Sequence, residues 1–299
     1  MPRERLHKVL ARAGVASRRH AEELIANGHV SVDGVEIRSM GVMVDPETQD
    51  IRFDGEKIRL EPPAYYLVNK PKGYLCTSDD PQGRRTVLSL VRDKKARRLY
   101  TVGRLDEESE GLIIVTNDGA FANRVAHPRY GVTKTYRLKL HGYLDEEDLK
   151  KARAGVWLSS GRTPSIYVRL ERRSQQFSEV TVKIREGQNR VLRRVFARLG
   201  HAVVRLQRVR IGPIMAKGLK RGAVRVLKPD EVKALLEASD PSKPSDLPPP
   251  PRRRRGAPAR SRASSSEGGA GRGGRKPSRG TGARGRSQRR SRPGPRRSR

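Results

Sequence analysis

The composition of the chain changes abruptly near residue 240, and this change limits which part can fold. Beyond it, Pro, Gly, Ser and Arg dominate, and almost no aliphatic side chain remains to be buried. Such a segment cannot bury enough apolar surface to offset the entropy of ordering its backbone. We therefore expect residues 241–299 to form a disordered basic tail and residues 1–240 to supply every hydrophobic core.

The charge of the chain favours a polyanionic partner. The net charge is +34, and the tail carries +17 of it, from 19 Lys and Arg against two acids. The other +17 lies on the part that is expected to fold, so the folded surface is itself basic. A basic folded surface is typical of proteins that bind nucleic acid.

The sequence contains no signal for membrane insertion or secretion and no cysteine pair for a disulfide bond. No run of about 18 apolar residues is present, and the N-terminal segment MPRERLHKVL lacks the apolar core of a signal peptide. The single cysteine, Cys76, excludes an internal disulfide and a Cys-rich zinc cluster. We predict a cytoplasmic protein without a membrane partner.

Residues 1–61 predict a small domain of two helices and a hairpin. Residues 5–13 place apolar side chains at helical spacing, and Ser17 is suited to cap a second helix. Asp33 and Gly34 stand between two Val-containing segments, which is the strongest short signal for a hairpin. The two prolines after this domain indicate a linker.

Residues 64–238 predict a larger α+β domain with a mixed, mainly antiparallel sheet and flanking helices. Strands are expected from Tyr65 onward and over the apolar run 112–115. Three further segments alternate apolar and polar side chains, as half-buried strands do: 136–140, 166–170 and 180–184. Residues 189–199 place apolar side chains on one helical stripe, with three arginines on the opposite side: Arg190, Arg194 and Arg198.

Basic residues concentrate around the bend between the two N-terminal helices. They can read phosphates or form an ordinary solvated face: Arg5, Lys8, Arg12, Arg18 and Arg19. The string RLHKVLARAGVASRRHAEELIANGHVSVDGVEI resembles the RNA-binding domain first named for ribosomal small-subunit protein four. This resemblance implies RNA contacts from Arg5, Lys8, Ser17, Arg18 and Arg19. It leaves the reaction open, because the same domain type accompanies several enzyme classes.

Asp106 is the candidate for chemistry in the larger domain. It stands in the segment GRLDEESEGLIIVTNDG, residues 103–119, in a loop just before a buried strand. An ionised carboxylate can serve as nucleophile, base or metal ligand, although a loop Asp also commonly caps a turn. A metal site lacks partners, because the six histidines are scattered and no His-Glu helix motif or calcium loop is present.

This segment resembles the signature of RNA pseudouridine synthases related to ribosomal small-subunit pseudouridine synthase A. Three further strings match in the same order: YLVNKPKGYLCT, KTYRLKL and REGQNRVLRRVFARLGHAVVRLQRVRIGPI. Val191 departs from the pattern, since many relatives carry Gln there. The resemblance implies an isomerase that converts uridine in RNA to pseudouridine with neither a metal nor an organic cofactor. Ribosomal RNA is the implied substrate, and we favour the large subunit because relatives with basic tails include synthases of that specificity.

The same resemblance implies roles for four residues. Asp106 would attack the target nucleotide, at ribose C1′ or at base C6. Tyr136 would stack on the uracil with its hydroxyl within reach for proton transfer. Arg193 would pair with the catalytic carboxylate, and Arg104 would fill the gap that an extruded base leaves. Arg190 and Arg194 are expected to point straight to solvent.

A non-catalytic alternative stays open at this point, namely an RNA-binding ribosome assembly factor with the same charge pattern. Such a protein has no need of a carboxylate in a cationic cleft, where it would repel phosphate. A methyltransferase would need a glycine-rich nucleotide-binding turn after the first strand, and none follows Tyr65 to Asn69. We expect a monomer whose partner is structured RNA, either ribosomal RNA or a pre-ribosomal particle.

Overall fold

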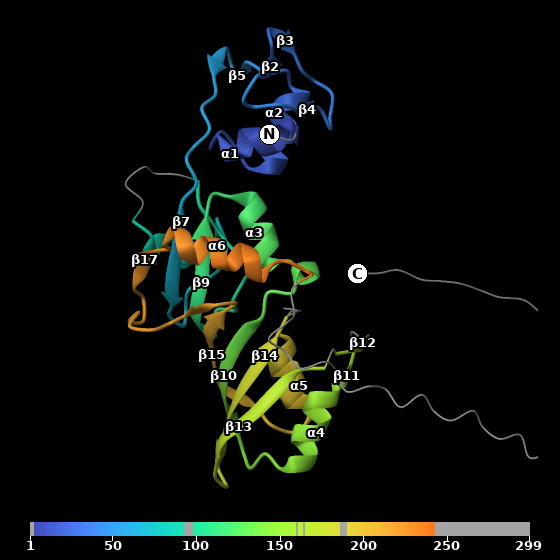
Figure 1. The fold of residues 1–299 in the computed structure, drawn as a ribbon, viewed down its shortest axis with the longest axis vertical. Helices are drawn as coiled ribbons and strands as arrows, with labels where there is room; N and C mark the ends of the chain where they lie inside the picture. The colour runs from blue at the N-terminus through green and yellow to red at the C-terminus, as the bar shows by residue number, and fades with distance from the viewer. Residues whose placement is uncertain (1–2, 93–97, 160, 164, 186–189, 243–299) are drawn as a thin grey trace, which may run out of the picture. The chain divides into compact units, whose positions relative to one another are not determined.

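The computed structural model describes residues 3–242 apart from 93–97, 160, 164 and 186–189 (Figure 1). The described part contains six α-helices and a mainly antiparallel sheet, so the predicted α+β architecture is confirmed. All but the first two positions of the predicted tail lie outside the described residues. None of the helices described here is long and apolar enough to cross a membrane.

A first group of elements lies within residues 4–57. They are β1 (Glu4–Arg5), α1 (Leu6–Arg12), α2 (Arg18–Ala26), β2 (Val30–Val32), β3 (Val35–Glu36), β4 (Met43–Val44), β5 (Ile51–Phe53) and β6 (Glu56–Lys57). β1 pairs with β4, and the other strands form an antiparallel sheet in the order β3-β2-β5-β6. The apolar stripes of α1 and α2 and the buried side of this sheet share one core cluster, which includes Leu6, Val9, Ile25, Val30 and Ile51.

The two local signals predicted for this group are confirmed. The Ser17 hydroxyl accepts a hydrogen bond from the His20 amide at 3.1 Å and thereby caps α2. Asp33 and Gly34 have φ angles of 52° and 83°, the left-handed conformation of a tight hairpin turn between β2 and β3. The Asp33 carboxylate also accepts from the Asp50 amide at 2.9 Å, which ties this turn to the start of β5.

A second group of elements follows from Tyr65. Its long strands are β7 (Tyr65–Lys70), β9 (Glu110–Thr116), β10 (Lys134–His141), β13 (Tyr167–Arg173), β14 (Phe177–Ile184) and β15 (Val203–Ile211), and its short ones are β8 (Tyr100–Thr101), β11 (Trp157–Leu158), β12 (Gly161–Arg162), β16 (Ile214–Met215) and β17 (Val224–Val226). Its α-helices are α3 (Gly119–Ala126), α4 (Glu146–Ala154), α5 (Val191–Arg198) and α6 (Pro229–Ala238). Two short 3-10 helices cover Val87–Leu90 and Pro128–Tyr130.

Nine of these strands form one sheet. Its main order is β13-β14-β10-β15-β9-β7-β17, with β16 beside β15 and β8 beside β9. Among the strand pairs that the structure describes in this sheet, only β9 with β15 is parallel. The predicted strands are therefore present, and the helix predicted over residues 189–199 is observed as α5. Strand β14 alternates buried and half-buried side chains along its whole length.

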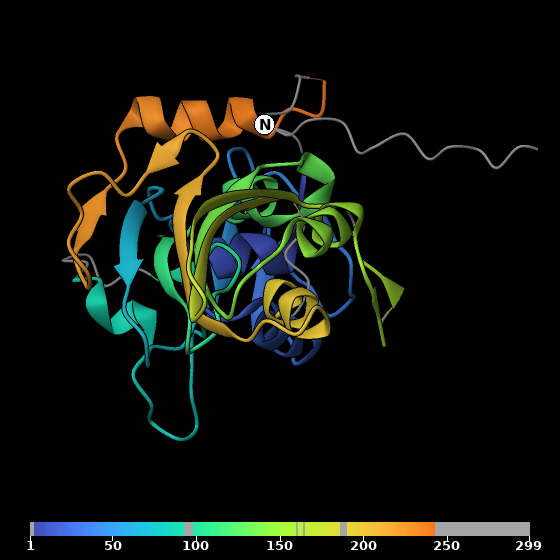
Figure 2. The ribbon, with the colours of Figure 1, turned by 90° about the horizontal axis from the view of Figure 1, so that it is seen from below.

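Helices cover both faces of the sheet, which explains why β9 is apolar at successive positions. Leu112 of β9 packs with Phe121 of α3 in a cluster that also includes α6. Ile113, the next residue, points to the opposite face and packs with Phe196 of α5 in a cluster that also includes α4. Figure 2 shows α6 along one side of the strands and α5 on the other. A strand buried on both faces has no polar alternation to display.

Gly111 makes the parallel pairing of β9 with β15 possible. It lies opposite Arg208 in the register and has a φ of 108°. A Cβ atom at this position would lie 2.2 Å from the Arg208 carbonyl oxygen. Only glycine fits there, so the approach of β9 to β15 depends on this residue.

Candidate active site

Asp106 lies in the loop that connects β8 to the buried strand β9. Its side chain is 33% exposed, so the carboxylate can meet a ligand that arrives from solvent. The Ser109 amide donates to the Asp106 carbonyl at 3.0 Å and closes a turn after it. Leu105, which precedes it, is buried in the core cluster that also contains Tyr136. The loop is thus anchored in the core while the carboxylate stays accessible.

The single cysteine of the chain holds the backbone just before Asp106. The Leu105 amide donates to the Cys76 Sγ at 3.4 Å. Burial raises the pKa of the Cys76 thiol above its ordinary value, so this thiol stays protonated near neutral pH. A buried, protonated thiol is a poor nucleophile, and its contact with Leu105 supports the loop.

Lys70, at the end of β7, fixes the other end of the loop. Its side chain is fully buried. The Nζ atom donates to the carbonyl oxygens of Pro71 at 2.9 Å, Glu107 at 3.2 Å and Ser109 at 2.7 Å, so each of its three hydrogens has an acceptor. Burial lowers the pKa of Lys70, while the charges of nearby groups, Asp106 among them, oppose this shift. Sequence reasoning did not single out Lys70, although it stands in the matched string YLVNKPKGYLCT.

Arg190 is the cation that approaches Asp106 in an ion pair. Its Nη1 atom lies 4.0 Å from Asp106 Oδ2, and its Nη2 atom donates to Glu108 Oε2 at 3.0 Å. The hydrogen bond from Arg190, together with its charge and that of Arg193, lowers the pKa of Glu108. The structure therefore differs from the expectation that Arg190 points straight to solvent, because the loop of Asp106 and Glu108 lies within its reach.

Arg193 lies deeper than Arg190, at the edge of the apolar stripe of α5. Its side chain is 14% exposed, its Nη1 atom donates to the Val203 carbonyl at 3.0 Å, and its Nε atom lies 3.7 Å from Glu108 Oε2. Burial lowers the pKa of Arg193, and the charges of Glu108 and Asp106 raise it. Within the described residues Arg193 forms no ion pair with Asp106 itself. Its buried Nε atom lacks a hydrogen-bond partner there, which leaves a donor for a ligand or a shifted carboxylate.

Tyr136 and Arg104 are the two remaining candidates in the second group of elements. Tyr136 lies in β10, between Val182 of β14 and Arg208 of β15, and is buried in the cluster of Leu105. Arg104 is exposed two positions before Asp106. Arg194, expected in solvent, is half-buried and donates to Ser159 Oγ at 3.2 Å.

The N-terminal candidates form an exposed basic surface around the start of α2. The side chains of Arg5, Lys8, Arg18 and Arg19 are exposed. Arg18 Nη2 lies 3.2 Å from His7 Nε2, and burial followed by the charge of Arg18 lowers the pKa of His7. The Ser17 oxygen is occupied by the helix cap, although its hydroxyl hydrogen remains available as a donor. Among the described residues, no group of three or more His, Cys, Asp or Glu side chains could hold a metal ion.

Both parts of the chain match known families. The family model for RNA pseudouridylate synthase matches residues 64–198, and the model for the S4 domain matches residues 4–50. A solved structure described as pseudouridylate synthase has a TM-score of 0.56 and 29% identity to this chain, with 77% of this chain and 99% of that chain covered.

Curated relatives extend this likeness along most of the chain. Ribosomal large subunit pseudouridine synthase B of Bacillus subtilis (strain 168) is 40% identical over 242 residues, which are 80% of this chain and 98% of that protein. An uncharacterized RNA pseudouridine synthase of Aquifex aeolicus (strain VF5) is 39% identical over 235 residues, which are 78% of this chain and 94% of that protein.

Proposed function

The chain belongs to the RNA pseudouridylate synthase family, and we propose that Asp106 is the nucleophile with which it isomerises uridine in large-subunit ribosomal RNA. The chain is thus an RNA pseudouridine synthase, an isomerase. The main support for this role is the accessible carboxylate of Asp106. Lys70 holds the loop through a hydrogen bond to Ser109, and the Arg190 guanidinium forms an ion pair with the carboxylate. The large-subunit target is proposed from the name of the Bacillus subtilis relative.

The reaction of this family requires that the loop hold the Asp106 carboxylate in a fixed position. A loop Asp attacks the target nucleotide, the bond between N1 and C1′ breaks, and the uracil rotates and is rejoined through C5. Attack requires a carboxylate held in a fixed position, because a misplaced nucleophile loses most of the advantage of proximity. Lys70 supplies this rigidity, since it binds the carbonyl groups of two residues that follow Asp106.

Tyr136, Arg193 and Arg104 complete the proposed site. Tyr136 stacks on the uracil in this proposal, and its place in the cluster of Leu105 supports a position near the loop. Arg193 carries a buried donor that has no hydrogen-bond partner among the described residues, which supports a role in holding a carboxylate or the RNA. Arg104 is exposed, as a side chain must be if it replaces an extruded base in the RNA stack.

We also propose a division of labour between residues 1–61, which bind structured RNA, and residues 64–238, which carry the chemistry. The exposed arginines and lysine around α2 support the first role. The relatives favour catalysis over the non-catalytic assembly factor, because proteins covered over nearly their full length are named as synthases. The monomeric state, the ribosomal RNA or pre-ribosomal partner and the cytoplasmic location stay predictions.

The test is to replace Asp106 with Asn, which removes the charge and nearly preserves the shape. Ribosomal RNA from a deletion strain is mapped for pseudouridine after complementation with each variant. We expect Asp106→Asn to bind RNA normally and to leave the target uridine unmodified, whereas Glu107→Gln, the matched control one position later, restores the modification. Pseudouridine formed by Asp106→Asn would overturn the assignment.

A further inference from the structure

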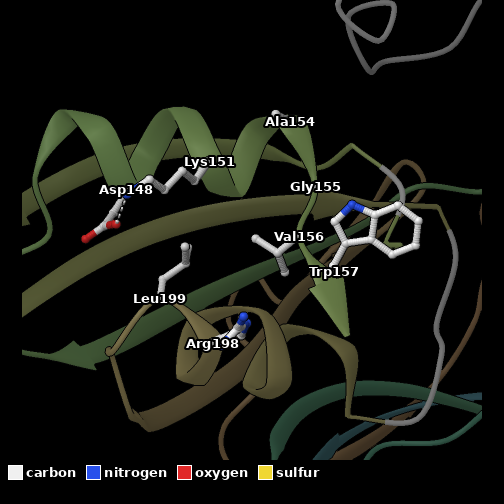
Figure 3. A pocket seen from close by; sticks show the side chains of 8 residues that line it. All are labelled: Asp148, Lys151, Ala154, Gly155, Val156, Trp157, Arg198 and Leu199. Atoms are coloured by element: carbon white, nitrogen blue, oxygen red, sulfur yellow. Dashed lines mark ion pairs between the residues drawn. The ribbon is translucent and has the colours of Figure 1, made fainter. Parts of the chain in front are cut away.

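A groove lies between α4 and α5, and its lining residues are none of those assigned to the site at Asp106. Its volume is about 480 Å³, a size typical of ligand sites. Lys151 and Ala154 of α4 form one wall and Arg198 of α5 forms the other (Figure 3). Trp157 closes one end, and Asp148 lies at the other.

Trp157 is the most unusual residue of this groove. It is the only tryptophan of the chain, and its side chain is 69% exposed, the highest value among the large hydrophobic side chains of the described residues. Burial of an indole ring normally stabilises a fold, and this ring contributes little in that way. An exposed aromatic ring on a basic protein can serve as a stacking platform for nucleobases.

The charges around Trp157 suit a phosphate. Arg162 lies directly opposite Trp157 across the β11–β12 ribbon. Arg198 is exposed and lines both this groove and an adjoining hollow that also includes Trp157. At the far end, Asp148 is paired with His201 at 3.1 Å and with Lys151 at 3.7 Å. A phosphate therefore belongs at the Trp157 end, away from this carboxylate.

The groove is connected to the catalytic loop through α5. Arg194 donates to Ser159 and so holds the β11–β12 ribbon against the helix. Arg190 faces Asp106, and Arg194 and Arg198 follow it at four-residue intervals, with the Arg194 amide bonded to the Arg190 carbonyl. Eight helical residues span about 12 Å, the length of three to four nucleotides in a stacked strand. The three arginines thus lead from the catalytic carboxylate to Trp157.

We propose that this groove binds an unpaired nucleotide of the RNA substrate, with its base stacked on Trp157 and its phosphate on Arg198. The proposal rests on the proposed function only for the identity of the RNA. A single strand fits better than a duplex, because paired bases keep their faces stacked on one another. A flexible single strand can also follow the row of arginines on α5.

Because the chain has a single tryptophan, the intrinsic fluorescence of the full-length enzyme reports on Trp157 alone. Intrinsic fluorescence is titrated with an eight-nucleotide oligouridylate, with an abasic oligonucleotide of equal charge, and with polyphosphate. We expect the oligouridylate to quench the emission, because a nucleobase stacks on the indole. The abasic strand and polyphosphate should leave it nearly unchanged. Cations elsewhere in the chain bind all three ligands, and they do not report on Trp157.

Variants then test the contribution to affinity by fluorescence anisotropy of the labelled oligouridylate. Trp157→Ala should weaken binding about ten-fold, since stacking of one base on an aromatic ring has an effect of that order. Trp157→Phe keeps an aromatic face and should stay close to the original affinity. Arg198→Ala should flatten the log-log salt slope by about 0.7, the value for one phosphate on a single strand. Arg172→Ala, the removal of an exposed arginine on the edge strand β13, is the matched control for Arg198→Ala and should leave the salt slope unchanged.

Two outcomes would overturn the proposal. One is quenching of equal size by polyphosphate, and the other is absence of quenching at oligouridylate concentrations where anisotropy shows binding. Failure here is separable from failure of the proposed function, because pseudouridine mapping with Asp106→Asn does not depend on Trp157.

Discussion

Lys70 shows how a single buried cation can position a loop, here the loop of Asp106. Its ammonium group satisfies three carbonyl oxygens, two of them in the segment that follows Asp106. A buried cation is tolerated only where its donors are all paired, and the loop carbonyls are equally dependent on it. Lys70 and the Asp106 loop therefore stabilise one another.

Replacement of Lys70 with Met should loosen this loop. Methionine fills the space of the lysine stem but donates no hydrogen bond, so buried carbonyl groups lose their partner. Each such group costs about 1–3 kcal/mol, and we expect a loss of roughly 3 kcal/mol in the free energy of unfolding. Urea denaturation measures this loss of stability. Pseudouridine formation by the folded variant should decrease as well.

Lys72→Met provides the matched control for this change. Lys72 lies two positions later and is exposed, so its replacement should alter stability by no more than about 0.5 kcal/mol. Equal losses for the two variants would show that the contacts of the Lys70 ammonium group do not stabilise the loop.

At the scale of elements, β9 is the strand on which the site depends. It is buried along its whole length, it begins four residues after Asp106, and its start pairs in parallel with β15. Arg208 of β15 donates to the Leu112 carbonyl at 2.6 Å and strengthens the same junction. A shift of β9 against β15 would displace the loop of Asp106.

Gly111→Ala should produce such a shift. The added Cβ atom meets the Arg208 carbonyl, and the φ of 108° strains any L side chain. The two effects together should lower the free energy of unfolding by about 3 kcal/mol or more. Gly161→Ala separates them, because Gly161 has a similar φ of 103° but nothing within 4 Å of a Cβ atom. We expect a loss of only about 1 kcal/mol there, in the same urea experiment.

At the scale of the whole molecule, net charge governs the encounter with RNA. The +34 charge is divided equally between residues 1–240 and the tail, which lies almost wholly outside the described residues. Phosphate contacts release counterions and make binding depend on salt, whereas in our proposal the reaction itself takes place at Asp106. Removal of the tail should therefore change affinity and leave the reaction as it is.

Deletion of residues 241–299 tests this separation. If half of the 19 tail cations engage a single strand, the log-log salt slope of binding should flatten by about 7. The map of pseudouridines should stay the same. An unchanged slope would contradict the electrostatic role of the tail, and an altered map would assign it a part in target choice.

The sequence by itself determined the local elements of this protein. Ser17 caps α2, and Asp33 with Gly34 turns a hairpin, because capping and turn geometry depend on neighbouring residues. Strand β14 and the apolar stripe of α5 follow from periodicity for the same reason. Asp106 was identified only through its resemblance to a family signature, since a loop aspartate has no distinguishing pattern of its own.

Only the tertiary structure decided which side chains meet. The apolar periodicity of α5 indicates which side of the helix faces the core. It does not indicate that the loop containing Asp106 and Glu108 lies near Arg190. Arg190 was expected in solvent for this reason, yet it binds Glu108, a residue 82 positions away. Lys70 likewise binds a carbonyl group that is distant in the sequence, that of Glu107. Gly111 is required because β9 pairs with β15, a strand that is also distant in the sequence. Such contacts depend on how the sheet brings distant segments together, and no local pattern encodes them.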